Sequence, residues 1–283
     1  MFTALMLLAA TAGADVQPTA QTVSAQPPIV VTGERLGDPE AIRRYVRHIA
    51  TPSQDQLARL HAPVCPLISG MPEPYAGRLA ERIRSVARTA GLRAGGAGCT
   101  PNVNLIFTEN AASFVQAARR SAPHMFLGLE PADVRRMVRR DPRVIAWHAT
   151  EVRNGDGLDN GPDGSTGPGM FVPNASIINL QTRQDILASY VVIEQSAAEG
   201  KDLNQLADYA AMRMLAEVRP PEGSAAPGAT ILSLFDTGAR APRGMTQLDA
   251  AYLNALYRAP VNVRFPQQAA TIAAIMNQET ARP

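Results

Sequence analysis

Residues Asp185 to Val218 read DILASYVVIEQSAAEGKDLNQLADYAAMRMLAEV. Within them, Tyr190 to Ile193 is a short apolar run rich in β-branched residues, which favours a strand that is covered on both faces. Further on, Asp202 and Gln205 have the spacing of a capping box and predict the start of a helix. One apolar stripe at helical spacing follows, formed by Leu203, Leu206, Ala207, Ala210, Met214 and Val218. A helix with such a stripe must pack against a sheet or other helices.

The same patterns can be traced along the rest of the chain. Capping residues and apolar stripes predict helices over 38–49, 74–90, 111–120, 131–140, 247–258 and 266–279. Runs typical of strands are found at 102–108, 144–152 and 176–180. Helices and strands are mixed without strict alternation. We therefore predict an α+β fold, with one mixed central sheet of about four to five strands packed by helices.

The first 14 residues are typical of an export signal. A short apolar run leads to Ala12-Gly13-Ala14, which resembles a cleavage site, although no positive charge precedes the run. The alternative is an ordinary buried N-terminal helix. We expect a signal peptide at 1–14, a disordered tether at 15–28, and a single α+β domain at 29–283 with an insert loop at 153–170. No later stretch is apolar enough to cross a bilayer. These features predict a periplasmic or secreted protein that is not an integral membrane protein.

The chain has two cysteines, Cys65 and Cys99. An even pair in an exported protein predicts a disulfide. The alternative is two free buried thiols.

The formal net charge of +2 is small for 283 residues and gives no indication of nucleic-acid binding. One expected helix does concentrate basic residues, which surround Val134, Met137 and Val138. They are Arg135, Arg136, Arg139 and Arg140. This helix could bind an anion. A solvated face is the favoured interpretation, because no aromatic residues are interleaved with the arginines.

Two further segments suggest binding. Ile29 to Arg35 resembles the TonB-box-like segment of outer-membrane receptors, which implies an envelope partner bound by strand addition. An ordinary edge strand is the favoured interpretation. The loop from Asn154 to Gly164 contains three aspartates with oxygen ligands that suit calcium, Asp156, Asp159 and Asp163. Their spacing is wrong for an EF-hand, so a long mobile hairpin loop is favoured there.

Familiar catalytic motifs are missing from the sequence. It has no H-E-x-x-H, no C-x-x-C and no G-x-S-x-G, and no two of its four histidines are spaced as a ligand pair. No cofactor is expected. A hydrolase site could still be assembled on the central strands and helix, with His148, Glu151, Asp208 and Tyr209 as candidates for general acid–base work.

Two resemblances bear on function. The phrases CPLISGMP, CTPNVNLIFT, RVIAWHATEVRNGDG, QLADYAAMR and GMTQLDAAYLNALYR resemble uncharacterised exported proteins of alphaproteobacteria, which implies export. The order of strand, long helix and the T-x-x-D-x-x-Y-L-x-x-L-Y helix from Thr246 to Tyr257 is similar to the core of matrixin-type zincin metalloproteases. In zincins the long helix carries two histidines and a glutamate. Gln205 to Arg213 has neither residue type, so the resemblance implies a zincin-like fold without its zinc site.

Together these observations favour a non-catalytic exported protein, a periplasmic or envelope binding or structural module. The alternative is the hydrolase built around His148 and Asp208.

Overall fold

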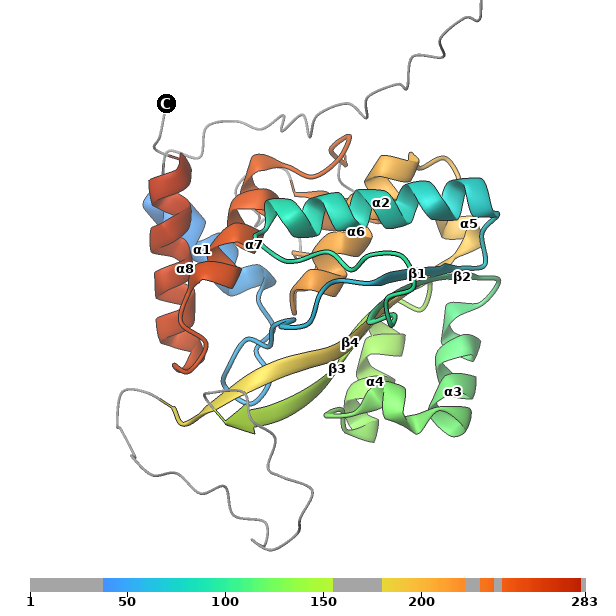
Figure 1. Cartoon of the computed structure of the whole chain (residues 1–283), viewed down its shortest axis with the longest axis horizontal. Helices are drawn as coiled ribbons and strands as arrows, with labels where there is room; N and C mark the ends of the chain where they lie inside the picture. Colours follow the sequence, from blue (N-terminus) through green and yellow to red (C-terminus); the bar gives the residue numbers. More distant parts are fainter. Residues whose placement is uncertain (1–37, 155–179, 222–229, 237–240, 281–283) are drawn as a thin grey trace, which may run out of the picture. The chain divides into compact units, whose positions relative to one another are not determined.

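The computed structural model describes residues 38–154, 180–221, 230–236 and 241–280 (Figure 1). Its strands are β1 (Pro66–Ser69), β2 (Val103–Thr108), β3 (Val144–Asn154) and β4 (Thr182–Glu194). Its helices are α1 (Pro39–Ile49), α2 (Glu73–Thr89), α3 (Ala111–Ser121), α4 (Pro131–Arg140), α5 (Gln195–Ala198), α6 (Leu203–Leu215), α7 (Gln247–Arg258) and α8 (Phe265–Thr280). Short 3₁₀ turns occur at Pro123–Phe126 (η1) and Ile231–Ser233 (η3).

The four strands form one mixed sheet in the order β1-β2-β4-β3. The first three in that order run parallel, and β3 pairs antiparallel with β4 at the edge. The central strand β4 is the one that contains the apolar run Tyr190 to Ile193, and it is paired on both sides. The α+β fold with one mixed sheet is therefore confirmed.

Each face of the sheet has its own core. The larger core lies on the side covered by α2, α6 and the helices packed with them, α1, α7 and α8 (Figure 1). The smaller core lies on the opposite face, beneath α3, η1 and α4. Alternate residues of β3 divide between the two, since Val144 belongs to the larger core and Ile145 and Trp147 belong to the smaller one. The pair α3 and α4 is thus a separate layer.

The structure confirms that α6 begins at a capping box formed by Asp202 and Gln205. The helix ends at Leu215, before Val218, whose backbone instead bridges Ala50. Almost all of α6 is buried, because α2 packs on it from one side, η3 and α7 from another, and the sheet lies beneath. The predicted helix and its packing against the sheet and other helices are confirmed, but the helix is buried on nearly all sides and not along one stripe alone. This is the central helix of the fold.

The strand β1 has no counterpart among the predicted elements. It is four residues long, starts at a proline and lies at an edge of the sheet, and these properties hide a strand from pattern analysis. Gly70 follows it with φ of 77°, and a Cβ at this position would lie 1.9 Å from the carbonyl oxygen of Phe107. The end of β1 thus requires a glycine.

The predicted disulfide is confirmed. Cys65 and Cys99 are bonded, with 6.0 Å between their Cα atoms. The backbone N–H of Cys65 also donates to the side-chain oxygen of Asn102 at 2.8 Å. The bond therefore fixes the start of β1 to the segment that leads into β2.

Several predictions fall on residues that the structure does not describe. The signal peptide and the tether lie wholly outside the described residues, as do most of the insert loop and all but Leu180 of the strand expected at 176–180. Leu180 itself is not in a strand. Among the described residues, no helix is both long and apolar enough to cross a membrane.

Candidate functional site

His148 lies in the middle of β3, opposite Ser189 of β4. Its side chain points to the same face as Val144, toward α6, and is only 8% exposed. Burial, together with the nearby positive charge of Arg213, lowers the pKa of His148 to about 3. No hydrogen bond to Nε2 occurs among the described residues, although the backbone carbonyls of Arg213 and Met214 lie nearby. The imidazole is therefore neutral at physiological pH and is a weak base.

Asp208 is fully buried within α6. Arg82 of α2 donates to both carboxylate oxygens, from Nε at 2.7 Å and from Nη2 at 2.9 Å. The backbone N–H of Met245 donates to Oδ2 at 2.8 Å. This carboxylate therefore joins α2, α6 and the segment that enters α7. Tyr209, the next residue of α6, is buried as well.

Tyr209 is held by Arg213, one turn further along α6. The Arg213 guanidinium donates to the phenol oxygen at 2.8 Å and lies 5.7 Å from the ring centre. Phe235 packs edge-on against the same ring. Burial raises the pKa of the Tyr209 phenol, so the group stays protonated at neutral pH.

The four predicted site residues do not share a hydrogen bond in the described structure. His148 and Tyr209 both lie near Arg213, whereas Asp208 is bonded to α2. The exposed carboxylate of Glu151 accepts from Arg153 at 3.0 Å. The segment 29–35 and the candidate calcium ligands Asp156, Asp159 and Asp163 lie outside the described residues. Within the described part of the chain, no three acidic, histidine or cysteine side chains are grouped as metal ligands would be.

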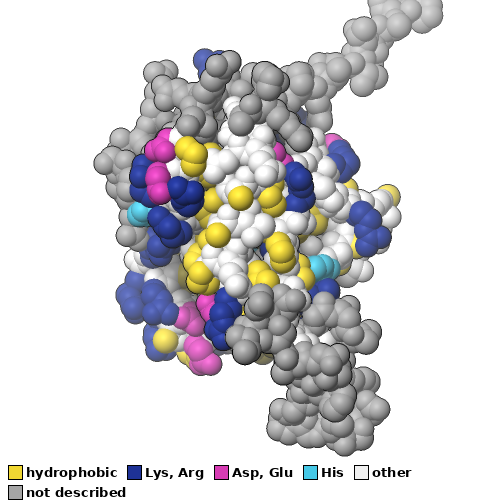
Figure 2. Space-filling model, turned by 90° about the vertical axis from the view of Figure 1, so that its left-hand side faces the viewer, with side chains coloured by type: hydrophobic (Ala, Val, Ile, Leu, Met, Phe, Trp, Pro, Cys, Tyr) yellow, Lys and Arg dark blue, Asp and Glu magenta, His cyan; other side chains and the backbone are white. Residues whose placement is uncertain are grey.

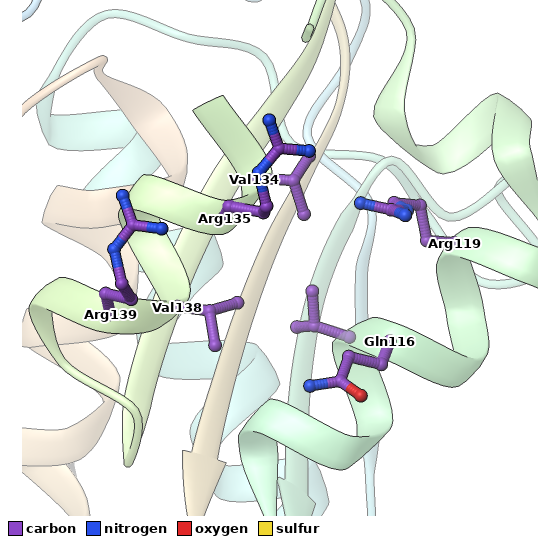
Figure 3. A pocket seen from close by; sticks show the side chains of 7 residues that line it. Gln116, Arg119, Val134, Arg135, Val138 and Arg139 are labelled. Atoms are coloured by element: carbon purple, nitrogen blue, oxygen red, sulfur yellow. The ribbon is translucent and has the colours of Figure 1, made fainter. Parts of the chain in front are cut away.

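A cleft of about 190 Å³ opens between α3 and α4. In Figure 3, α4 contributes Val134, Arg135, Val138 and Arg139 to one side, and α3 contributes Gln116 and Arg119 to the other. Val138 points into the space between the helices, and the Arg119 guanidinium is directed toward Arg135. With Val115 completing its floor, the cleft has an apolar base and a basic rim.

The three rim arginines, Arg119, Arg135 and Arg139, have no hydrogen bond or ion pair with any described residue. Many arginines elsewhere in the described structure are paired with acidic side chains. On the side of α1 and α8, shown in Figure 2, arginines lie next to acidic side chains. Two pairs there are Arg43 with Glu40 at 2.6 Å and Arg264 with Asp55 at 2.8 Å. Among the residues that the structure describes, no acidic side chain lines the cleft. Its positive charge is therefore available to a ligand.

Helix stability accounts for part of this arrangement. Arg119 and Arg139 lie in the last turns of their helices, where a cation interacts favourably with the helix dipole by about 0.3–1 kcal/mol. Arg135 lies in the middle of α4. It is four residues before Arg139, a like-charge spacing that costs about 0.2–0.5 kcal/mol. The helix dipole does not account for the placement of Arg135 next to Arg139. A bound anion would relieve the repulsion between their two positive charges.

The valine floor rests on the smaller core. Val115 and Val134 are buried there together with Trp147, the only tryptophan of the chain. Trp147 stacks between Phe126 and Tyr190, with 5.0 Å between ring centres on each side. Its indole N–H donates to the backbone carbonyl of Met125 at 2.8 Å. The floor of the cleft thus belongs to the same core as Trp147, whose fluorescence can report on ligand binding.

The sequence shows the arginines of α4 but not the cleft. Arg119 and Gln116 come from α3, and only the packing of the two helices brings them opposite Arg135. Residues 111–143 contain seven arginines against three acidic residues, so a segment of this nearly neutral chain carries a net charge of +4. This local concentration of charge is the signal that could have indicated the site.

A second polar centre is buried away from this cleft. Glu217, which follows α6, is 7% exposed. Its Oε1 accepts from the Ser53 hydroxyl at 2.5 Å, and its Oε2 accepts from the backbone N–H of Ala58 at 3.0 Å. Burial raises the pKa of Glu217 to about 7, against the opposing effect of these hydrogen bonds. Glu217 therefore fixes the segment after α1 and titrates near neutral pH.

Comparison with protein-family models, with curated proteins and with solved structures finds no match to the chain.

Proposed function

We propose that this protein is a non-catalytic exported binding protein, and that the cleft between α3 and α4 is its site for an anionic group. The observation that carries the proposal is the set of three unpaired guanidiniums, Arg119, Arg135 and Arg139, around a valine floor. Guanidinium groups present fixed N–H donors that match carboxylate and phosphate oxygens. Ligand sites commonly combine an apolar lining with a few polar groups, as this cleft does.

Export to the periplasm or the medium is supported by the disulfide between Cys65 and Cys99. Such bonds persist in oxidising compartments and are rare in the cytosol. The apolar run ahead of Ala12-Gly13-Ala14 agrees with this proposal, with residues 1–14 as the signal peptide.

The absence of catalysis is supported by the state of Asp208. Its two oxygens are occupied by Arg82 and Met245, so neither is free to accept a proton from a substrate. The hydrolase alternative needs Asp208 to work with His148, and no hydrogen bond connects them in the described structure.

A degenerate zincin-like fold is part of the same proposal. The order β4, α6, α7 supports it, and so does the capping box that Thr246 and Asp249 form at the start of α7. Asp249 also accepts from the hydroxyl groups of Tyr45 and Thr230, at 3.0 and 2.5 Å. These contacts give the T-x-x-D pair a structural role.

The test is calorimetric titration of the purified protein with inorganic phosphate at low ionic strength, where exposed charges are least screened. We expect binding that weakens at least about tenfold in Arg135→Gln, because a hydrogen bond to a charged group contributes about 1.5–3 kcal/mol. Arg136→Gln is the matched control, since Arg136 is on the same helix, pairs with Asp133 and does not line the cleft. Absence of binding, or equal binding by Arg135→Gln, would refute the proposal.

A further inference from the structure

We infer that the cleft takes a single-chain anionic amphiphile, whose phosphate monoester headgroup lies among the rim arginines and whose first methylene groups lie on the valines. This inference rests on the proposed function and names the ligand class of the same site. It follows from the division of the cleft into a basic rim and an apolar base.

The positive charge of the rim determines which headgroup fits best. Three guanidiniums, from Arg119, Arg135 and Arg139, line the cleft, and the described lining residues include no acidic side chain. A carboxylate brings one negative charge, whereas a phosphate monoester brings about 1.5 to 2 at neutral pH and three acceptor oxygens. The several oxygens of one phosphate can accept hydrogen bonds from donors of both α3 and α4. The phosphate monoester is therefore the better match for the rim.

The valine floor of the cleft suits an apolar part of the ligand. Val115 and Val134 are buried, and Val138 is half-buried and points into the gap between the helices (Figure 3). An inorganic anion held at the rim would leave this apolar surface in contact with water. An alkyl chain that follows the headgroup would cover it, and burial of apolar surface is favourable in proportion to its area.

The size of the cleft limits how much chain it can hold. At about 190 Å³ it is smaller than the roughly 300–1,000 Å³ of typical small-molecule pockets. It has room for a headgroup and only the start of a chain. Affinity should therefore rise with the first methylenes and then reach a plateau.

The residues around the cleft favour a free amphiphile, and not a lipid in a membrane surface, as the molecule that carries the phosphate. The lining residues include no aromatic side chain and none of the large exposed apolar residues that anchor proteins at bilayers. The nearby exposed Leu127 is a single side chain and lies outside the cleft. We therefore assign the site to a soluble alkyl phosphate.

The experiment titrates the full chain with methyl, butyl, hexyl and dodecyl phosphate, and follows calorimetry together with Trp147 fluorescence. We expect affinity to rise about fourfold for each added methylene that enters the cleft, and to level off in the longer ligands. Hexanol should not bind, because it lacks the charge. Heptanoate, which carries a carboxylate on a hexyl chain, should bind more weakly than hexyl phosphate.

Two variants separate the contribution of the phosphate headgroup to affinity from that of the alkyl chain. Arg135→Gln should weaken all the phosphates alike. Val138→Asn should remove the dependence on chain length, so that the variant binds methyl and hexyl phosphate with equal affinity. Arg120→Gln on α3 and Arg136→Gln on α4 are exposed controls that do not line the cleft, and both should match the wild type.

The outcomes distinguish the two proposals. Equal affinity for methyl and hexyl phosphate would overturn the amphiphile and leave the anion site standing. No binding of any phosphate would overturn both. Binding to vesicles of anionic lipid without binding of soluble alkyl phosphates would overturn the assignment to a free ligand.

Discussion

Replacing Glu217 by glutamine should raise the stability of the protein above neutral pH and leave it almost unchanged in acid. The substitution preserves shape and hydrogen bonding. The amide oxygen of glutamine can accept from the backbone N–H of Ala58, and its NH₂ group can donate to the Ser53 hydroxyl, which can act as an acceptor. A protonated Glu217 can make the same two contacts. Only the carboxylate charge that develops at higher pH is removed.

The magnitude follows from the pKa of Glu217, which burial raises from 4.5 to about 7. Between these values the folded chain binds more protons at this site than the unfolded chain, so stability falls as pH rises. The advantage is fully present below pH 4.5 and is lost by the time the pH has passed about 7. At about 1.4 kcal/mol per pH unit, the loss amounts to roughly 3 kcal/mol.

The assay is urea denaturation of wild type and Glu217→Gln at several values between about pH 4.5 and 8. Other groups titrate in this range, so the informative quantity is the difference between the two proteins. That difference should grow with pH in favour of the variant. Glu199→Gln, an exposed position, is the control and should show no such trend. A difference that is constant with pH, or that grows in favour of the wild type, would refute the reasoning.

Four further variants test the fold. Asp208→Asn should cost about 3 kcal/mol of unfolding free energy, because it leaves Arg82 without its charge partner, and unchanged denaturation would contradict the structural role of this pair. Gly70→Ala should cost roughly 3 kcal/mol or more, because its Cβ meets the Phe107 carbonyl. Gly91→Ala, also at positive φ but with open space around its Cβ, should cost only about 1–2 kcal/mol, and equal thermal shifts would refute the clash. The double substitution Cys65→Ser with Cys99→Ser should cost about 2–4 kcal/mol and make stability insensitive to reductant, whereas a wild type equally insensitive to reductant would contradict the disulfide.

Local signals in the sequence predicted most of the elements. Asp202 and Gln205 mark the start of α6 because a capping box is formed by residues three apart. The strand β1 was missed because its four edge residues carry too short a pattern. The burial of Asp208 could not be foreseen, since its partner Arg82 is 126 positions away along the chain and only the folded structure pairs them.

The sequence indicated only the part of the candidate site that lies on α4. The pattern of α4 displays Arg135 and Arg139, and a solvated face is the ordinary interpretation of such residues. They form a candidate site only together with Arg119 on α3 and the valines between the two helices. The described lining residues include no acidic side chain, and all of these features result from packing. The residues expected to do chemistry, His148 and Asp208, are instead buried parts of the fold.

The central claim is that Arg119, Arg135 and Arg139 together bind an anion. Its most direct measurement is NMR of the arginine side-chain N–H groups during titration with methyl phosphate. We expect the signals of these three arginines to shift together along one saturable curve, while those of Arg120 and Arg136 stay in place. Uniform small shifts of all exposed arginines, or no shifts at the three rim positions, would contradict it.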